Sequence, residues 1–245
     1  MKTYSYNDLI NLYQNKVKKD NSYFIKYQNL DPYKDGKIEE MLNGRDYPRV
    51  PCVLDFKEWI LKYNIVPEKM LYTSETDFEL NYIQPKSKEL LEYDPATNNG
   101  DLHSLSLKDK DYDFILFSQT IEHLYNPFKA IEKIYEHTKS GGFVFTSVPT
   151  INIPHMTPIH FAGIYPMGLA VMFESAGFEV MEIGQWGNIN YLNYIFHHHG
   201  WPDHQYLSQI ANAQLRGSPH FQSYNGIVAN EEANIAQCWC LARKN

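Results

Sequence analysis

The side chains best suited to moving a proton follow two apolar runs in the middle of the chain. His123 comes shortly after residues 114–117, and His155 and His160 come shortly after residues 143–147. An imidazole changes charge near neutral pH, so a histidine at a reaction site can accept a proton from a hydroxyl group. We therefore expect His160 to act as a general base, with His123 and His155 beside it. The alternative for each is a solvated, substrate-contacting or packing role.

Two strands and a crossover helix are expected to place these histidines. Residues 114–117 and 143–147 are apolar without alternation, which is typical of strands covered on both faces of a parallel sheet. Residues 127–138 between them carry apolar side chains at helical spacing. Ser118 and Gln119 follow the first strand, at the sheet edge where open α/β folds bind their ligands. The pattern predicts an α/β fold with its site at that edge.

The segment that carries this pattern, DYDFILFSQTIEHLYNP followed by KSGGFVFTSVP, resembles the class I S-adenosylmethionine-dependent methyltransferases. The likeness is to their small-molecule, methyltransferase type 11-like branch and runs from about Lys69 to the C-terminus. The block IPHMTPIHFAGIYPMGLAVMFESAGFEVMEIGQWGN and the tail ANIAQCWCLARKN are similar to later parts of the same domain. The resemblance implies S-adenosyl-L-methionine as the cofactor. It also implies a doubly wound, mostly parallel, seven-stranded Rossmann-like sheet with an antiparallel last strand.

The chain divides into two parts on this interpretation. Residues 1–66 are expected to form an N-terminal helical cap, with Ser5 capping its first helix and residues 56–63 forming another. Residues 67–245 are expected to form the S-adenosylmethionine-binding domain, with an insertion at about residues 188–232. The expected strands of that domain cover residues 69–74, 88–94, 99–103, 113–117, 143–147, 178–183 and 233–242.

The loop after the first expected strand departs from the family pattern. Family members have a glycine-rich G-x-G-x-G loop there, because glycine permits a positive φ and a close approach of the backbone to the cofactor. Residues 69–79 contain no glycine. We expect a reshaped loop that contacts the cofactor through Thr73, Ser74 and Glu75. A different alignment of this segment, or a domain that no longer binds the cofactor, are the alternatives.

The resemblance also implies residues for the nucleoside. An acid at the end of the second strand holds the ribose, and Asp94 fits because a carboxylate can accept two hydroxyl hydrogen bonds. Glu92 is the rival position, and an Asp-Pro turn is the alternative role for Asp94. Asp101 and Leu102 are expected beside the adenine, unless they lie in a solvated loop. The tip of the fourth strand is expected to line the methionine end of the cofactor, through Ser118 and Gln119.

A metal ion is not expected next to this tip. Gln119, Glu122 and His123 resemble a Glu-x-x-Glu-His element that is associated with a divalent ion in ubiquinone-type O-methyltransferases. Here Gln119 replaces the first acid, and a neutral amide is a weaker ligand for a hard cation. Without a metal, His123 lines the reaction site or packs beneath it.

A second group of histidines falls in the insertion. The run His197-His-His-Gly-Trp-Pro-Asp-His204 invites a zinc site, but consecutive histidines rarely all face one ion, and no H-E-x-x-H spacing follows. We expect the wall of a substrate pocket or a subunit contact there, which leaves a homodimer open.

Composition limits the partners. The chain of 245 residues has 22 Lys and Arg against 29 Asp and Glu, a net charge of −7, so we expect no nucleic-acid partner. It has no apolar run of about 18 residues, so no membrane span is expected. Cys52, Cys238 and Cys240 have no disulfide-framework spacing, which favours a reducing compartment. We expect a cytoplasmic, soluble protein.

The leading hypothesis is methyl transfer from S-adenosylmethionine to an oxygen of a small polar acceptor. A sugar, a sugar nucleotide or a glycan precursor is favoured, because pockets rich in aromatic and histidine side chains suit polyols. A catalytically inactive binding or regulatory subunit with the same fold is the first alternative. A metal-dependent hydrolase or lyase that uses residues 197–204 is the second.

Overall fold

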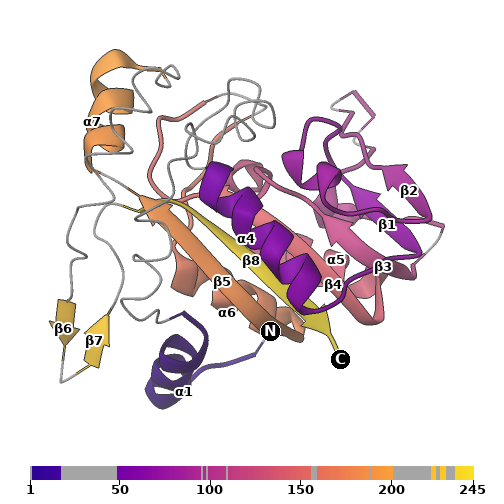
Figure 1. Ribbon diagram of the computed structural model, residues 1–245, viewed down its shortest axis with the longest axis horizontal. Helices are drawn as coiled ribbons and strands as arrows, with labels where there is room; N and C mark the ends of the chain where they lie inside the picture. The colour runs from indigo at the N-terminus through magenta and orange to yellow at the C-terminus, as the bar shows by residue number, and fades with distance from the viewer. Residues whose placement is uncertain are drawn as a thin grey trace.

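A six-stranded sheet forms the centre of the molecule (Figure 1). The computed structural model describes residues 2–17, 49–94, 96–97, 99–108, 110–155, 159–187, 189–200, 222–224, 227–229 and 235–245. The strand order is β2-β1-β3-β4-β8-β5, and β8 is antiparallel to both of its neighbours. The strands are β1 (Lys69–Tyr72), β2 (Ser87–Leu90), β3 (Tyr112–Leu116), β4 (Thr138–Pro149), β5 (Phe178–Gly187) and β8 (Ile235–Lys244). A separate hairpin pairs β6 (Gln222–Tyr224) with β7 (Ile227–Ala229).

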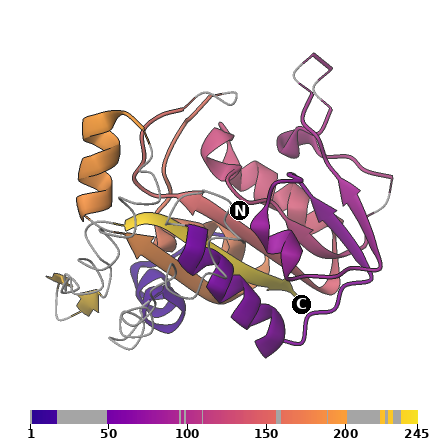
Figure 2. The ribbon, with the colours of Figure 1, turned by 45° about the horizontal axis from the view of Figure 1, so that its top comes forward.

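The doubly wound α/β class and the antiparallel last strand are confirmed, but the expected number of seven strands is wrong for the described residues. Residues 99–103, expected as a strand, contribute only an isolated bridge between Asp94 and Asn99 and the start of a single helical turn, η3 (Leu102–Ser104). Local turn chemistry explains the difference. Gly100 has a φ of +76°, and the Asp101 carboxylate accepts the His103 amide. The segment with this bridge projects beyond the sheet (Figure 2).

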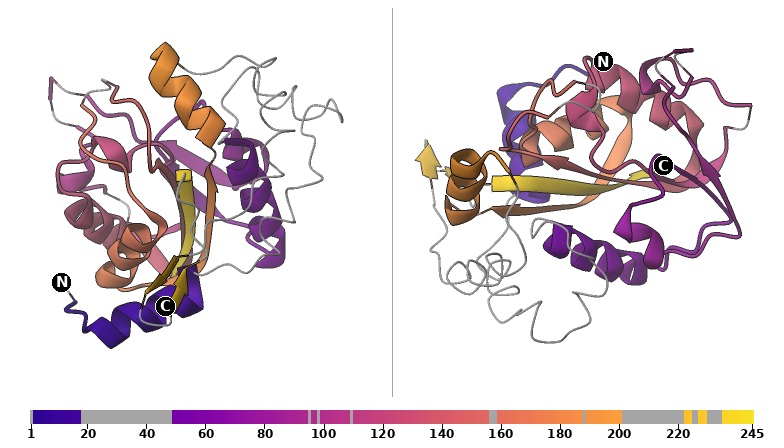
Figure 3. Two further views of the ribbon diagram at one scale, coloured as in Figure 1. Left: turned by 90° about the vertical axis from the view of Figure 1, so that its left-hand side faces the viewer. Right: turned by 90° about the horizontal axis from the view of Figure 1, so that it is seen from above.

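Helices cover both faces of the sheet (Figure 3). α1 (Tyr6–Leu12), α5 (Pro127–His137) and α6 (Pro166–Ala176) lie on one side, and α4 (Arg49–Lys62) lies on the other. α7 (Ile189–His198) follows β5. The arrangement gives three layers, with the parallel strands buried on both faces as their unbroken apolar sequence predicts.

Local sequence signals explain where several helices begin and end. Ser5 and Asp8 form a capping box at the start of α1, so the predicted cap is confirmed. Asn126 caps α5, and Pro127 occupies its first turn. Gly177 ends α6 with a φ of +105°. Within the described part of the chain, no helix is both long and apolar enough to cross a membrane.

Each helical layer has its own apolar core. Ile131 of α5 and Phe173 of α6 are fully buried on one face of the sheet. On the other face Phe56 of α4 contacts Phe145 of β4, with ring centroids 4.7 Å apart. α4 therefore packs on the sheet, although it lies in the region expected as a cap. The domain boundary at residue 66 stays a prediction.

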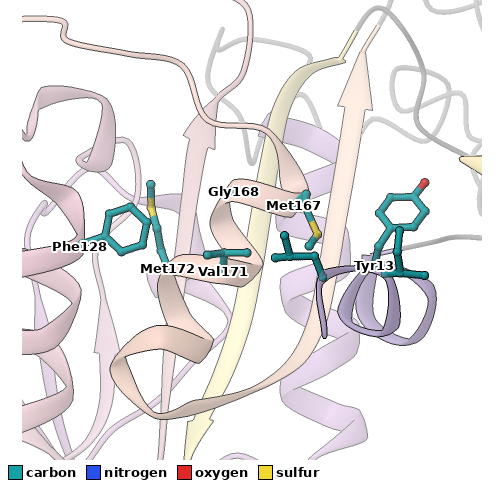
Figure 4. Close-up of a pocket in the computed structure, with 8 residues that line it drawn as sticks. Tyr13, Phe128, Met167, Gly168, Val171 and Met172 are labelled. Carbon is teal, nitrogen blue, oxygen red and sulfur yellow. The ribbon is translucent and has the colours of Figure 1, made fainter. Parts of the chain in front are cut away.

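The helical layer with α1 also contains an apolar groove (Figure 4). Side chains from α1, α5 and α6 line it, among them Leu9, Phe128, Met167 and Val171. Apart from the Tyr13 hydroxyl its lining is apolar, so it offers no carboxylate, imidazole or thiol.

Trp239 connects the sheet to α4 through a buried hydrogen bond. Its indole Nε1 donates to Asp55 Oδ2 at 2.9 Å, and both side chains are almost fully buried. Gly184 of β5 lies against this pair, and a Cβ at that position would be 2.0 Å from Trp239 Nε1. The position requires glycine because the Trp239 indole and the Asp55 carboxylate fill the space that a side chain would occupy.

We predict that Gly184→Ala destabilises the protein by about 2–4 kcal/mol, since the methyl group overpacks the core and displaces a buried hydrogen bond. The measurement is the midpoint of urea unfolding. Gly200→Ala is the control, because its added Cβ would meet nothing closer than His198 O at 3.8 Å. Equal midpoints for the two variants would contradict this account of the core.

A candidate active site at the carboxyl edge of the sheet

The parallel strands β1, β3 and β4 end at one edge of the sheet, and the predicted site residues begin there. Thr73 N donates to Leu116 O at 3.2 Å, and Gln119 N donates to Ser147 O at 2.7 Å. The first bond joins Thr73, which follows β1, to the end of β3, and the second joins Gln119, which follows β3, to β4. The structure therefore places these predicted cofactor residues on neighbouring strands.

Gln119 has a strained backbone at this edge. Its φ is +51°, a left-handed conformation that residues other than glycine rarely adopt. Two contacts to Ser147 hold it there, because the amide donates to the carbonyl and Nε2 donates to Oγ at 3.1 Å. Strain of this kind is concentrated at functional sites, so it supports a site at the end of β3.

The glycine-free loop has an ordinary backbone. None of residues 73–79 has a positive φ, so the chain needs no glycine there. Ser74 Oγ accepts the Thr76 amide at 3.2 Å, which closes a local turn, and Glu75 is exposed. Thr73 Oγ1 is buried and has no hydrogen-bond partner among the described residues.

A buried ion pair that sequence reasoning missed holds this loop in place. Arg49 Nη2 lies 3.0 Å from Glu79 Oε2 and 3.4 Å from Asp77 Oδ1, and Glu79 has no exposed surface. Arg49 Nη1 donates to Ser147 Oγ at 3.2 Å, and Ser118 Oγ donates to Glu79 Oε1 at 3.4 Å. The network joins α4, the turn η2 (Phe78–Asn81) and the ends of β3 and β4.

The bulky side chains of the loop are directed toward the helices. Phe78 packs with Val53 of α4 and with Tyr191 and Ile195 of α7, while Glu79 pairs with Arg49. Phe78 and Glu79 are thus occupied in contacts with helices and the ion pair. The side chains of residues 73–76 are polar, and those of Glu75 and Thr76 are exposed.

The predicted nucleoside residues make local contacts in the structure. The Asp94 carboxylate accepts from Ala96 N at 2.9 Å and from Thr97 Oγ1 at 2.6 Å, as a turn-starting residue does. Asp101 caps η3 and contacts His103 Nδ1 at 2.6 Å, and Leu102 is 3% exposed in the core. A cofactor role for Asp94, Asp101 and Leu102 stays a prediction.

The three predicted catalytic histidines lie together in the structure. His123 comes from η4 (Ile121–His123), and His155 and His160 come from the loop between β4 and α6. Ring centroids are 4.9 Å apart for His123 and His155, 4.9 Å for His155 and His160, and 6.0 Å for His123 and His160. Glu122 completes a four-residue group that we call the histidine cluster (Glu122, His123, His155 and His160).

Backbone hydrogen bonds hold the loop of residues 150–164 at its base. Ile164 N donates to Pro149 O at 3.0 Å, and Thr150 Oγ1 donates to Ile164 O at 2.9 Å. Gly163 makes this closure possible, because a Cβ there would lie 2.0 Å from Thr150 O. The ends of the loop therefore meet, as in an Ω-loop.

The outer part of the same loop is bonded to η4. Phe161 N donates to Glu122 O at 2.7 Å, and His123 Nδ1 donates to Ile159 O at 2.9 Å. These two bonds flank His160 and fix it beside Glu122 and His123. Sequence reasoning placed each histidine near the edge but had no signal for the bonds that join the two segments.

Burial sets the charge of the histidine cluster. It lowers the pKa of His123 and is the main cause of the lowered pKa of His160, with the neighbouring His155 adding to both shifts. Burial also raises the pKa of the Glu122 carboxyl to about 8. In the protein alone at neutral pH, His123 and His160 are therefore neutral and Glu122 is mostly protonated.

The insertion contributes less to this region. His197 and His198 lie in the last turn of α7 and are exposed, and His204 lies outside the described residues.

Cys52, Cys238 and Cys240 are free and buried, so the disulfide that their spacing argues against is not formed.

A comparison with known protein families identifies the family of this chain. The model of a methyltransferase domain matches residues 67–206, more than half of the 245-residue chain. This protein belongs to the methyltransferase domain family. It is an S-adenosylmethionine-dependent methyltransferase, as the sequence pattern predicts.

Solved structures are similar to this methyltransferase only at low identity. An S-adenosylmethionine-dependent methyltransferase from Thermotoga maritima is 13% identical, with 92% of this chain and 100% of that chain covered and a TM-score of 0.44. Phosphoethanolamine N-methyltransferase 2 from Haemonchus contortus, in complex with S-adenosylmethionine, is 12% identical, with 78% of this chain and 52% of that chain covered and a TM-score of 0.45. TehB from Haemophilus influenzae is 15% identical, with 78% of this chain and 62% of that chain covered and a TM-score of 0.45. No curated protein matches the chain. The family assignment therefore rests on the domain match.

The carboxyl edge has groups that fit the cofactor. S-adenosylmethionine carries hydroxyl, amino and carboxylate groups, and the buried Thr73 hydroxyl has no protein partner among the described residues. Ser74 and Glu75 follow Thr73 in the chain, and the Ser118–Gln119 pair follows β3 at the same edge of the sheet. These residues would hold the cofactor, which supplies a methyl group already activated by a positively charged sulfur.

We predict that Arg49→Met destabilises the methyltransferase by about 3–5 kcal/mol, because Glu79 is left buried without its counterion. The double variant Arg49→Met/Glu79→Gln should be less destabilised than the sum of the single variants. The measurement is a double-mutant cycle of unfolding free energies.

The exposed pair Lys86–Glu68 is the matched control. Its charged atoms are 2.6 Å apart, and the two side chains are 75% and 67% exposed. Lys86→Met should lower stability far less than Arg49→Met does, because solvent screens both partners of this pair. Similar losses for Arg49→Met and Lys86→Met would show that the buried network does not hold the loop.

Proposed function

We propose that this methyltransferase methylates an oxygen of a small polar acceptor, such as a sugar, a sugar nucleotide or a glycan precursor. The observation that carries the proposal is the convergence of His123, His155 and His160 beside the strand end where Ser118 and Gln119 lie. An oxygen acceptor must lose a proton, and neutral imidazoles can accept one.

In this proposal the chain positions the two reactants on either side of Gln119. Thr73, Ser74, Glu75, Ser118 and Gln119 hold the cofactor at the ends of β1 and β3. The histidine cluster faces the acceptor at the end of β4. The rigid hydrogen bonds of both loops keep the reacting groups aligned, and alignment alone is worth several orders of magnitude in rate.

His160 is the proposed proton acceptor among the three histidines. Its Nδ1 is buried and has no hydrogen-bond partner among the described residues, whereas His123 Nδ1 already donates to Ile159 O. His160 lies between Ile159 and Phe161, whose backbone bonds to η4 fix its position. His123 and His155 line the same space and orient the acceptor.

Exposed apolar side chains next to the cluster support a polyol acceptor. Phe161 is 50% exposed and Ile159 is 46% exposed, on either side of His160. A flat aromatic face beside a few polar groups is a common arrangement in small-molecule sites, and it can pack on the C–H face of a sugar ring. The acceptor would then lie between Phe161 and the imidazoles.

We predict that Thr73→Val weakens binding of S-adenosylhomocysteine about 3- to 10-fold, the equivalent of one lost hydrogen bond. The same variant should leave the protein without ligand as stable or slightly more stable, because a buried hydroxyl without a partner is removed. Calorimetric titration and thermal unfolding measure the two effects.

Thr146→Val is the matched control for this substitution. The Thr146 hydroxyl donates to Phe117 O at 2.7 Å, so its loss should lower stability and leave the affinity for S-adenosylhomocysteine unchanged. If the wild-type protein binds neither S-adenosylmethionine nor S-adenosylhomocysteine, the catalytic proposal fails and the non-catalytic alternative is favoured.

We predict that His160→Asn lowers kcat about 100-fold or more, with the affinity for S-adenosylhomocysteine unchanged. The assay follows a labelled methyl group into a panel of sugar nucleotides, free sugars, phenols and amines, and locates the methylated atom by mass spectrometry. Methylation of nitrogen as the main product would overturn the choice of oxygen. If the His160→Asn variant had the wild-type kcat, His160 would not be the base.

A further inference from the structure

The Glu122 carboxyl group is in an unusual environment for a charged side chain. It has no exposed surface, and neither oxygen has a hydrogen-bond partner among the described residues. Buried carboxylates in proteins are normally paired with a cation, hydrogen-bonded or bound to a metal. Arg49, whose charge acts on Glu122, is already engaged with Glu79 and Asp77. Among the described residues, the ligand atoms of His123 and His155 lie within 4.8 Å of this carboxylate.

Two of those imidazoles present the nitrogen that binds metals. A carbonyl oxygen can only accept a hydrogen bond, so His123 Nδ1, 2.9 Å from Ile159 O, must carry the ring proton. His155 Nδ1 lies 3.3 Å from Ile153 O and is fixed in the same way. In the neutral form that binds metals, each ring then has its lone pair on Nε2. Metal-binding histidines commonly have this arrangement, with the second ring nitrogen donating to a backbone carbonyl.

The donor atoms are close enough to share one ion. One ligand atom each from Glu122, His123 and His155 lies within 4.8 Å of the other two, and His123 Nε2 is 3.8 Å from Glu122 Oε1. Zinc binds its ligands at about 2.0–2.1 Å, so tetrahedral donors are roughly 3.4 Å apart. Side-chain rotations that move the donors by roughly 1 Å would therefore complete the site without moving the backbone.

We propose that Glu122, His123 and His155 bind a divalent transition-metal ion of the zinc type. Two imidazoles and one carboxylate suit zinc and its neighbours in the first transition row, whereas magnesium and calcium prefer oxygen ligands alone. Three protein ligands leave a fourth position open for a water or a substrate oxygen. The His160 ring, 4.9 Å from that of His155, lies next to this group.

This proposal differs from what the sequence predicted. That expectation discounted a metal because Gln119 stands where the Glu-x-x-Glu-His element has its first acid, and in the structure Gln119 is bonded to Ser147. The ligand that completes the proposed set is His155, which is 33 positions from Glu122 and is brought there by the loop after β4. The donor set is therefore rich in nitrogen and favours a different metal.

The metal site could also act in the proposed methyl transfer, although the proposal that it binds metal does not depend on that reaction. An acceptor hydroxyl bound at the open position would be more acidic, because the ion stabilises the alkoxide. The proton would pass from the hydroxyl to His160. The ion itself is neither oxidised nor reduced.

Metal titration of the protein without cofactor tests the proposal. Untagged protein is stripped with a chelator and titrated with Zn²⁺ in a competition assay against a chromophoric chelator, with Mg²⁺ as the comparison ion. We expect about one equivalent of zinc per chain with a Kd below about 1 μM, and no competition by Mg²⁺. Binding of Co²⁺ should give the visible absorption of a four-coordinate site.

Three variants locate the ion. Glu122→Gln keeps the shape of the side chain and should weaken zinc binding by about 100-fold or more, as should His155→Ala. His197→Ala/His198→Ala is the control and should not alter the affinity, because those two residues lie on α7. Thermal unfolding without metal shows that each variant is folded.

The outcomes separate this proposal from the proposed function. A Kd weaker than about 0.1 mM, or wild-type affinity in both Glu122→Gln and His155→Ala, would overturn the metal site. Loss of binding in His197→Ala/His198→Ala alone would place the ion on α7 and would also overturn it. Binding of S-adenosylhomocysteine is measured separately without metal, so its failure would count against the methyltransferase proposal only.

Discussion

The ion pair between Arg49 and Glu79 is the interaction on which the carboxyl edge of this methyltransferase depends. Taking both charges out of water costs several kcal/mol per ion, and their attraction offsets this only where further hydrogen bonds satisfy them. Ser118 and Ser147 provide those bonds, from the ends of β3 and β4. Because the four side chains come from different elements, a shift of any one of them breaks an ion pair or a hydrogen bond of a buried charge. The ion pair therefore does more to fix one arrangement of the edge than to raise the free energy of unfolding.

This constraint explains how a glycine-free loop can follow β1. Glycine is required where the backbone takes a positive φ or where a Cβ would collide with a ligand. Residues 73–79 avoid the first requirement, since none of them has a positive φ. The Glu79 side chain anchors the loop to Arg49. The backbone of residues 73–79 therefore needs no sharp turn to stay beside the strand ends. The left-handed residue of this edge is Gln119, on the neighbouring strand, where Ser147 stabilises it by two hydrogen bonds.

The sequence predicts the parts of this structure that depend on short-range patterns. The strand, helix and strand from Tyr112 to Pro149 are recognisable because their apolar residues follow strand and helix periods. The expected strand at residues 99–103 is wrong because Gly100 and Asp101 form a turn, and Leu102 is the one apolar residue in this segment. The Arg49–Glu79 pair joins residues 30 positions apart, and no local pattern reports such a contact. The three histidines were placed at the edge individually, but the bonds that hold them around Glu122 arise only in the folded chain.

Burial gives the histidine cluster two chemically distinct states. In a site of low dielectric, a carboxyl without a partner holds its proton, and the pKa of about 8 for Glu122 reflects this. The same environment strengthens the attraction between an ionised Glu122 and a cation, because little water screens the charges. An ion that enters must exchange its water for imidazole nitrogen and carboxylate oxygen. Magnesium gives up water reluctantly and gains little from imidazole, whereas zinc binds imidazole well. Burial and nitrogen ligands together therefore select a transition metal, and they do so at the end of β4, where a substrate oxygen could complete its coordination.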